Sequence, residues 1–310
     1  MTDLPKILAV VGTTCSGKTD LGLVLARAVD GEVICADSRT IYKGLDIGTA
    51  KPVGRRDWGF GTLGDDKPLV VDGVFHWGLD LVEPDVAFSA ADFQTYADKK
   101  IAQILERGRT PILVGGTGLY IRAVIDRPTF GAVAPDQELR LLLATLSNED
   151  LLQEIAVRDP DTAATIDIHN RRRLERAVEM LRATGLPLAE TRTFATPLYC
   201  ATQVGLTVPR DALYTRIAQR VQRMIADGLV DEVRNIFQKY GADCPALSGI
   251  GYRELVHFFQ GKMSLAAAIA EIVRNTQLYA KRQETWFKRD TRIHWFTNND
   301  DVLASRIFLN

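Results

Sequence analysis

The sequence has few cysteines, no long apolar run and no metal-ligand pattern. Its four cysteines are widely spaced and form no C-x-x-C pair: Cys15, Cys35, Cys200 and Cys244. This spacing argues against a zinc site or a disulfide framework and favours a reducing compartment. No apolar stretch is long enough to cross a membrane, and the first residues lack the layout of a signal peptide. We therefore expect a cytoplasmic protein without a membrane partner.

The sequence also lacks an excess of either charge. Lysine and arginine together number 38, and aspartate and glutamate 39, so the net charge is −1. The overall charge gives no sign of nucleic-acid binding, and any such partner has to be recognised through a local patch. With 310 residues, the chain is long enough to bury a full α/β core and to carry a smaller second unit.

A glycine-rich segment near the start of the chain is the clearest candidate site. It reads Gly12-Thr13-Thr14-Cys15-Ser16-Gly17-Lys18-Thr19, and it lies between an apolar run at 7–11 and helical spacing at 21–26. Strand, G-x-x-x-x-G-K-[ST] and helix in this order predict a phosphate-binding loop, the P-loop. Lys18 supplies a positive charge, and Thr19 a hydroxyl for a divalent ion. The loop itself does not say which molecule carries the phosphates.

Two further predicted strands end at polar or glycine-rich segments. Residues 31–36 are followed by Asp37-Ser38-Arg39, and residues 111–114 by Gly115-Gly116-Thr117-Gly118. Carboxyl ends of parallel strands form the ligand crevice, so both segments should lie beside the P-loop. Asp37 could act as a general base, but a residue that only forms the turn or binds a metal ion would also fit at this position. The glycine segment suits a phosphate or base contact, or is only a tight turn.

The pattern as a whole predicts an α/β fold, with a P-loop core whose parallel sheet is flanked by helices, plus a helical insertion. Residues 1–128 form the first part of the core, residues 129–198 the insertion, and residues 199–310 the second part. The insertion shows helical patterns and no strand signal, whereas the alternation of apolar and polar residues that is typical of a strand returns at 202–208.

Shorter predictions complete this organisation. Helices are expected at 135–146, 148–157, 170–183, 210–227, 229–240, 252–259 and 264–289. Ser89-Ala90-Ala91-Asp92 has capping-box spacing and opens another helix. Residues 53–73 are expected to form an exposed loop, and a strand at 292–296 to close the fold.

Basic residues gather on several of the predicted helices. Arg216 and Arg220 are four apart and suit a diphosphate clamp, although a solvated helix face has the same spacing. The run 171–173 lies in the insertion, and Lys281 lies near Trp286 on the long helix. Cations with interleaved aromatics suit single-stranded or loop RNA. The alternative is a set of solvated cations around core aromatics.

Seven segments together resemble bacterial tRNA dimethylallyltransferases (tRNA isopentenyltransferases). They are the P-loop, Asp37-Ser38, Asp46–Pro52, Ser89–Phe93, Gly115–Tyr120, Gly249–Glu254 and Lys281–Phe287. The resemblance covers essentially the whole chain. The sequence departs from the family's usual residues at Thr13, Cys15 and Gly118, and its loop at 53–73 is longer than typical.

The resemblance implies a magnesium-dependent transfer of a dimethylallyl group. The donor would be dimethylallyl diphosphate, and the acceptor N6 of adenosine 37 in the tRNA anticodon stem-loop, flipped out of its stack. The P-loop residues Gly12, Thr13, Thr14, Cys15, Ser16, Gly17, Lys18 and Thr19, with Arg220, would bind the diphosphate. Asp37 would be the general base, and Lys18, Thr19, Thr117 and Arg216 would hold the diphosphate or its Mg²⁺.

The same resemblance implies a set of tRNA contacts and a monomeric enzyme. The contacts would come from Asp37, Ser38, Arg39, Thr40, Thr117, Arg140, Arg172, Arg173, Arg176, Gly249, Tyr252, Arg253, Lys281 and Arg282. The metal ligand would be Thr19. Three alternatives stay open from the residues: an adenylate isopentenyltransferase acting on free AMP, ADP or ATP, a small-molecule P-loop kinase, and a non-catalytic RNA-binding module.

Overall fold

The computed structural model describes residues 4–56, 67–130, 133, 136–191 and 193–309. It divides into two compact units, which we call the core unit (Met1–Ile125 with Leu198–Asn310) and the helical unit (Asp126–Pro197). Among the residues just named as described, no helix is both long and apolar enough to span a membrane.

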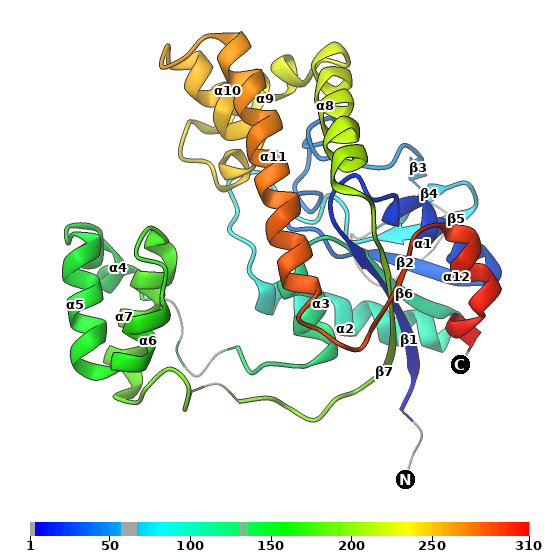
Figure 1. Cartoon of the computed structure of the whole chain (residues 1–310), viewed down its shortest axis with the longest axis horizontal. Helices are drawn as coiled ribbons and strands as arrows, with labels where there is room; N and C mark the ends of the chain where they lie inside the picture. Colours follow the sequence, from blue (N-terminus) through cyan, green and yellow to red (C-terminus); the bar gives the residue numbers. More distant parts are fainter. Residues whose placement is uncertain (1–3, 57–66, 131–132, 134–135, 192, 310) are drawn as a thin grey trace. The chain divides into compact units, whose positions relative to one another are not determined.

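The core unit is built on a sheet with strand order β3-β4-β5-β2-β6-β1-β7-β8 (Figure 1). Six of these strands run in parallel: β5 (Val74–Trp77), β2 (Gly31–Cys35), β6 (Thr110–Gly115), β1 (Lys6–Gly12), β7 (Cys200–Leu206) and β8 (Ile293–Phe296). The other two form an antiparallel edge: β3 (Arg55–Arg56) and β4 (Leu69–Val71).

The antiparallel edge corrects the expected loop at 53–73. Its described parts contain β3 and β4, which add an antiparallel edge to the predicted parallel sheet, so the prediction of a loop was wrong there. The residues 57–66 of that segment lie outside the described residues. A short strand such as Arg55–Arg56 carries no apolar alternation, so composition does not reveal it.

Helices cover both faces of the sheet, as an α/β fold requires. Ile7 and Ala9 of β1 pack on one side, and Leu8 and Val10 on the other, because successive strand residues point to opposite faces. The first side is covered by α2 (Ala90–Glu106), α3 (Gly118–Ile125) and the end of α11 (Leu265–Phe287). The second side is covered by α1 (Lys18–Ala28) and α12 (Asn299–Ser305).

Two details test the local predictions. The capping box of α2 is formed in both directions, since the Ser89 hydroxyl accepts from the Asp92 N–H and the Asp92 carboxylate accepts from the Ser89 N–H. The strand β8 does not close the fold, because α12 and a short 3₁₀ turn (Ile307–Leu309) follow it. Val302 of α12 is fully buried against the sheet.

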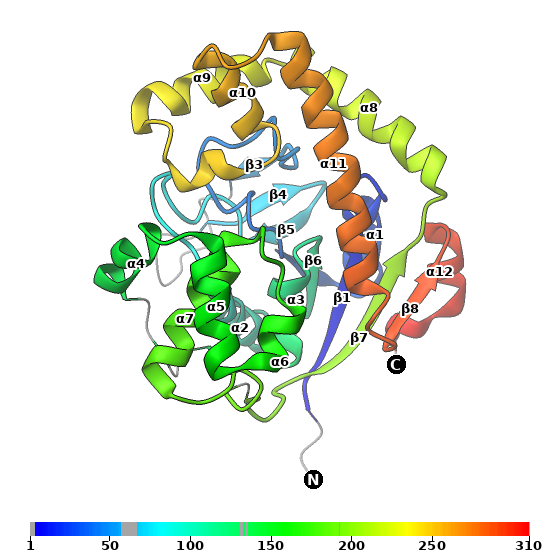
Figure 2. The same cartoon turned by 60° about the vertical axis from the view of Figure 1, so that its left-hand side comes forward.

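A layer of helices lies at the carboxyl ends of the parallel strands (Figures 1 and 2). It consists of α8 (Arg210–Ala226), α9 (Leu229–Tyr240), a 3₁₀ turn (Pro245–Ser248), α10 (Tyr252–Phe259) and the start of α11. These helices share one apolar cluster with Ile41, Tyr42 and Leu45, which follow β2. The layer therefore covers the sheet edge at which ligands bind in open α/β folds.

The helical unit has its own small core. Its helices are α4 (Gln137–Ala144), α5 (Asn148–Arg158), α6 (Pro160–Thr165) and α7 (Arg171–Thr184). Leu143, Ile155 and Leu174 are fully buried in one cluster. The short helix α6 was not predicted, although Asp159 caps it and Pro160 is its first residue. The predicted helix start at Pro135 lies outside the described residues.

Candidate active site

The P-loop connects β1 to α1 and has the geometry of an anion site. Gly17, the residue before α1, has φ +93°, and no side chain caps the helix. The first N–H groups of a helix lack partners within it, so they are available to an anion. The Ser16 hydroxyl is buried and has no hydrogen-bond partner among the described residues. Both features fit a bound phosphate group.

Lys18 lies inside this loop. Its ammonium donates to the Thr13 carbonyl oxygen over 3.2 Å. Burial lowers the pKa of Lys18, and the negative charge of Asp37 opposes that shift. A second anion beside Lys18 would favour the charged form for the same reason.

Two adjoining compartments open beside the P-loop, and both lie within the core unit. The first, which we call the loop compartment, has a volume of about 110 Å³ and includes Lys18, Thr19 and Cys35 in its wall. The second, which we call the apolar compartment, measures about 340 Å³; aliphatic side chains such as Ile217 and Ile272 form part of its wall, and charged side chains such as Arg282 form another part. Thr14, Asp37, Thr49, Arg220 and Tyr279 line both.

Asp37 follows β2 after one residue, Ala36, and lies beside the P-loop, as the strand order predicts. One of its carboxylate oxygens accepts the Arg39 N–H over 2.8 Å. The Thr117 hydroxyl accepts the Ser38 N–H over 3.0 Å, and the Thr117 N–H donates to the Ala36 carbonyl oxygen. The segments after β2 and β6 are therefore fixed to each other, and they hold one carboxylate oxygen at the compartment wall.

Arg216 and Arg220 extend from α8 to the P-loop. Arg220 donates to the Thr49 carbonyl oxygen over 3.2 Å and lies 3.5 Å from the Thr14 hydroxyl. Arg216 lies 3.5 Å from the Cys15 carbonyl oxygen. The clamp spacing read from the sequence thus brings both guanidinium groups to one loop.

Two residues of α11 complete the wall, and sequence reasoning missed both. Gln283 is nearly buried, and its amide accepts the Thr14 N–H and donates to the Gly116 carbonyl oxygen, each over 2.8 Å. Burial, together with the charge of Asp37, raises the pKa of Tyr279 to about 12. The sequence signals were indirect: Tyr279 lies beside the basic residues of the long helix, and Gln283 lies within the Lys281–Phe287 block.

Comparison with known proteins now decides the family. The IPP transferase family model matches residues 40–290. A tRNA dimethylallyltransferase of Geobacillus kaustophilus is 42% identical over 301 residues, which is 95% of this chain and 91% of that protein. A tRNA dimethylallyltransferase of Roseiflexus is 42% identical over 91% of this chain and 90% of its own length. The chain belongs to the tRNA dimethylallyltransferase family. It is therefore a prenyl transferase, and the resemblance read from the sequence is confirmed.

Solved structures of this family share the fold. The full-length tRNA isopentenylpyrophosphate transferase of Bacillus halodurans has a TM-score of 0.70 at 36% identity, covering 98% of this chain and 95% of its own. A eukaryotic dimethylallyltransferase acting on tRNA has a TM-score of 0.73 at 23% identity, over 95% of this chain and 74% of its own. The predicted α/β P-loop fold is confirmed.

Several residues expected at the family's tRNA interface have structural partners here. Arg39 donates to the Pro245 carbonyl oxygen and to the Ser248 hydroxyl, each over 3.2 Å, and its side chain lies against Gly249. Thr40 is buried, and its hydroxyl lies 3.4 Å from the Asp37 carbonyl oxygen. These contacts fix the segment after β2, and they leave the predicted tRNA contacts as predictions.

Tyr252 and Arg253 begin α10 and differ in exposure. The Tyr252 side chain is buried, and its hydroxyl donates to Glu232, so it does not lie on an open surface. The Arg253 guanidinium is half exposed and pairs with Glu254 over 2.9 Å. Both residues line the apolar compartment.

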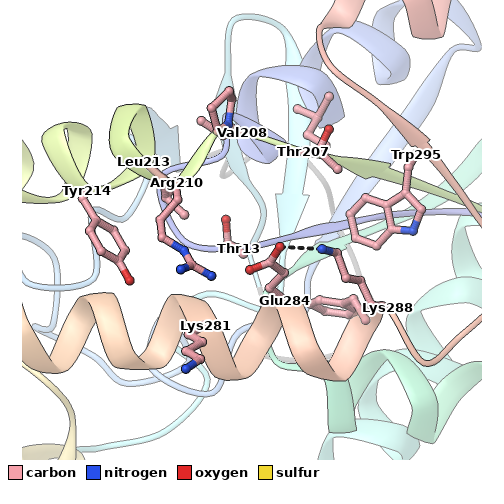
Figure 3. A pocket seen from close by; sticks show the side chains of 13 residues that line it. Thr13, Thr207, Val208, Arg210, Leu213, Tyr214, Lys281, Glu284, Lys288 and Trp295 are labelled. Atoms are coloured by element: carbon pink, nitrogen blue, oxygen red, sulfur yellow. Dashed lines mark hydrogen bonds and ion pairs between the residues drawn. The ribbon is translucent and has the colours of Figure 1, made fainter.

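Lys281 and Arg282 are neighbours on α11 but face different cavities. Arg282 lines the apolar compartment, whereas Lys281 lines a third pocket of about 330 Å³. Figure 3 shows this pocket between α8 and α11, with Arg210 and Lys281 on its walls and Thr13 of the P-loop beside them. Lys288 is ion-paired with Glu284 there over 2.7 Å. The two predicted tRNA cations therefore do not share one surface.

The predicted cations of the helical unit fall into two groups. Arg140 and Arg176 both bind the buried Glu179 carboxylate, at 3.0 and 2.6 Å. The side chains of Arg172 and Arg173 are exposed, and neither makes a side-chain hydrogen bond or ion pair among the described residues. The second pair is therefore better suited to a phosphate backbone.

A metal would have few protein ligands in the loop compartment. Thr19 and Asp37 offer a hydroxyl and a carboxylate in its wall. Among the described residues, no group of three or more His, Cys, Asp or Glu side chains is arranged to hold a metal ion. This donor set fits Mg²⁺, which is usually held by one or two protein oxygens together with substrate phosphates.

Proposed function

We propose that this chain transfers the dimethylallyl group of dimethylallyl diphosphate to N6 of adenosine 37 in the tRNA anticodon stem-loop and releases diphosphate. We further propose that it acts as a cytoplasmic monomer with Mg²⁺. One observation carries the proposal: Lys18, Arg220 and the Asp37 carboxylate line a polar compartment that adjoins a larger one with an aliphatic wall. A diphosphate with an aliphatic tail needs this combination.

The residues divide the chemistry between the two compartments. The α1 N-terminus, Lys18 and Arg220 bind the diphosphate and stabilise the charge that grows on it as the bond between the prenyl carbon and the phosphate oxygen breaks. The aliphatic wall holds the prenyl group. Asp37 accepts the proton that N6 loses as the new carbon–nitrogen bond forms.

A magnesium ion would be held by the Thr19 hydroxyl together with oxygens of the substrate diphosphate. It would supply charge that neutralises the diphosphate as it leaves. The adenine has to leave its stack to reach this wall, because the P-loop and Asp37 line compartments that a base within the stack cannot enter.

The test is to incubate the full chain with Mg²⁺, labelled dimethylallyl diphosphate and one of three acceptors: unmodified tRNA, AMP or ATP. The proposal expects label in the tRNA alone. Label in AMP or ATP instead would make the chain an adenylate isopentenyltransferase. The exposed cations Arg172 and Arg173 favour the first outcome, because a free nucleotide needs no such surface.

A further inference from the structure

Glu232, in the first turn of α9, carries an unusual number of hydrogen bonds for a side chain outside the compartments. One carboxylate oxygen accepts the N–H groups of Asp46 and Ile47 over 2.9 and 2.7 Å. The other accepts the Gly48 N–H over 3.1 Å and the Tyr252 hydroxyl over 2.7 Å. Four donors fill the roughly four lone-pair sites of a carboxylate.

These bonds fix a segment that forms part of the compartment wall. Gly48 and Thr49 line the apolar compartment, and Thr49 also lines the loop compartment. Tyr252 packs so closely on this turn that a Cβ added at Gly48 would lie 2.5 Å from the Tyr252 hydroxyl oxygen. Burial and the charge of Glu232 raise the pKa of Tyr252, so its hydroxyl stays protonated and continues to donate.

The turn 46–49 also holds Arg220 in place. One guanidinium nitrogen of Arg220 donates a hydrogen bond to the Thr49 carbonyl oxygen over 3.2 Å. The other terminal nitrogen lies 3.5 Å from the Thr14 hydroxyl. Arginine loses much side-chain entropy when it is fixed in one place, so an anchor of this kind lowers the cost of binding an anion.

We propose that Glu232 is a positioning residue for the diphosphate: it fixes the turn 46–49, and the turn places Arg220 over the P-loop. This inference rests on the proposed function for the identity of the anion. Among the residues that the structure describes, Glu232 makes no hydrogen bond or ion pair with the P-loop, and it does not line either compartment. Its effect therefore passes through the Thr49 carbonyl oxygen and Arg220.

The test is a double-mutant cycle on the full chain, with inorganic diphosphate and Mg²⁺ titrated by calorimetry. Glu232→Gln keeps the size of the side chain and replaces one acceptor oxygen by an amide that repels the backbone N–H groups. We expect its diphosphate affinity to fall about tenfold. Because Glu232 acts through Arg220, Glu232→Gln should lower the diphosphate affinity by less than about a further twofold when Arg220 is already replaced by alanine.

The matched control is Asp231→Asn, which makes the same charge change at the neighbouring position of α9. Asp231 is largely exposed and pairs only with Arg234 among the described residues, so this variant should bind diphosphate within about twofold of wild type. Tyr252→Phe removes one of the four donors to Glu232. It should also weaken diphosphate binding, but by less than Glu232→Gln does. It also carries the test if Glu232→Gln does not fold.

Kinetics give an independent readout. Glu232→Gln should raise KM for dimethylallyl diphosphate and leave KM for tRNA unchanged, whereas general destabilisation would not single out the donor. Equal affinities in Glu232→Gln and Asp231→Asn, or the same loss with and without Arg220, would overturn the proposal. So would a wild-type chain that does not bind diphosphate. A wild-type chain that binds diphosphate but prenylates no tRNA overturns the proposed function instead.

Discussion

Replacing Asp37 by asparagine should remove the base and keep the site. In the structure one Asp37 oxygen accepts the Arg39 N–H over 2.8 Å, and an asparagine carbonyl accepts the same bond. The change in unfolding free energy should therefore stay below about 1 kcal/mol. The remaining carboxylate oxygen is lost as a proton acceptor. General bases contribute about 10²–10⁴-fold, so the barrier to transfer should rise by about 2.7–5.5 kcal/mol.

The assay is single-turnover transfer of labelled dimethylallyl groups to tRNA, with tRNA affinity measured separately by filter binding. The rate constant for transfer should fall by about 10²–10⁴-fold, while Kd for tRNA changes by less than about threefold. Asp20→Asn is the control, because Asp20 is an exposed carboxylate in the first turn of α1 and lines neither compartment. Transfer by Asp37→Asn at the wild-type rate would refute the role of Asp37 as base.

Three further predictions concern stability and tRNA binding. Gly48→Ala should lower the free energy of unfolding by about 1–3 kcal/mol in urea titrations, because the new Cβ would overlap the Tyr252 ring. Asp290, whose pKa is lowered to about 2 mainly by hydrogen bonds from Arg292, stabilises the fold above pH 4. That contribution, about 1–2 kcal/mol, is lost as pH falls from 4 to 2, and Asp290→Asn should remove this part of the pH dependence of Tm. Arg172→Ala should reduce the slope of log K for tRNA against log salt by about 1.

Each of these has a defined control or contrary result. Arg182→Ala leaves the tRNA salt slope unchanged if Arg182 is a structural cation, since it pairs with Glu154 over 2.7 Å. If the salt slope of tRNA binding is unchanged in Arg172→Ala, Arg172 does not contact the tRNA backbone and is an ordinary solvated side chain. A Gly48→Ala chain as stable as wild type, or an Asp290→Asn chain with the wild-type acid profile, would contradict the contacts described for those residues.

Local sequence signals predicted those parts of the molecule that depend on neighbouring residues. The P-loop, the α2 capping box and the bounds of α9 and α10 follow from spacing within a few residues. The position of Asp37 beside the P-loop followed from one rule about parallel strands.

The parts that sequence reasoning missed depend on contacts between distant segments. Gln283 meets the P-loop across 269 positions of the chain, and Glu232 meets Gly48 across 184. No periodicity records such pairs. The sequence also does not show that Arg140 and Arg176, both predicted to contact tRNA, share the buried Glu179.

The central claim is that the P-loop and Asp37 together deliver a prenyl group to one adenine amine in tRNA. The most direct measurement is transfer of labelled dimethylallyl groups to two otherwise identical anticodon stem-loops, one with adenosine and one with guanosine at position 37. Guanine has no N6 amine, so the account predicts label in the adenosine form and none in the guanosine form. Equal labelling of both, or labelling of neither, would contradict it.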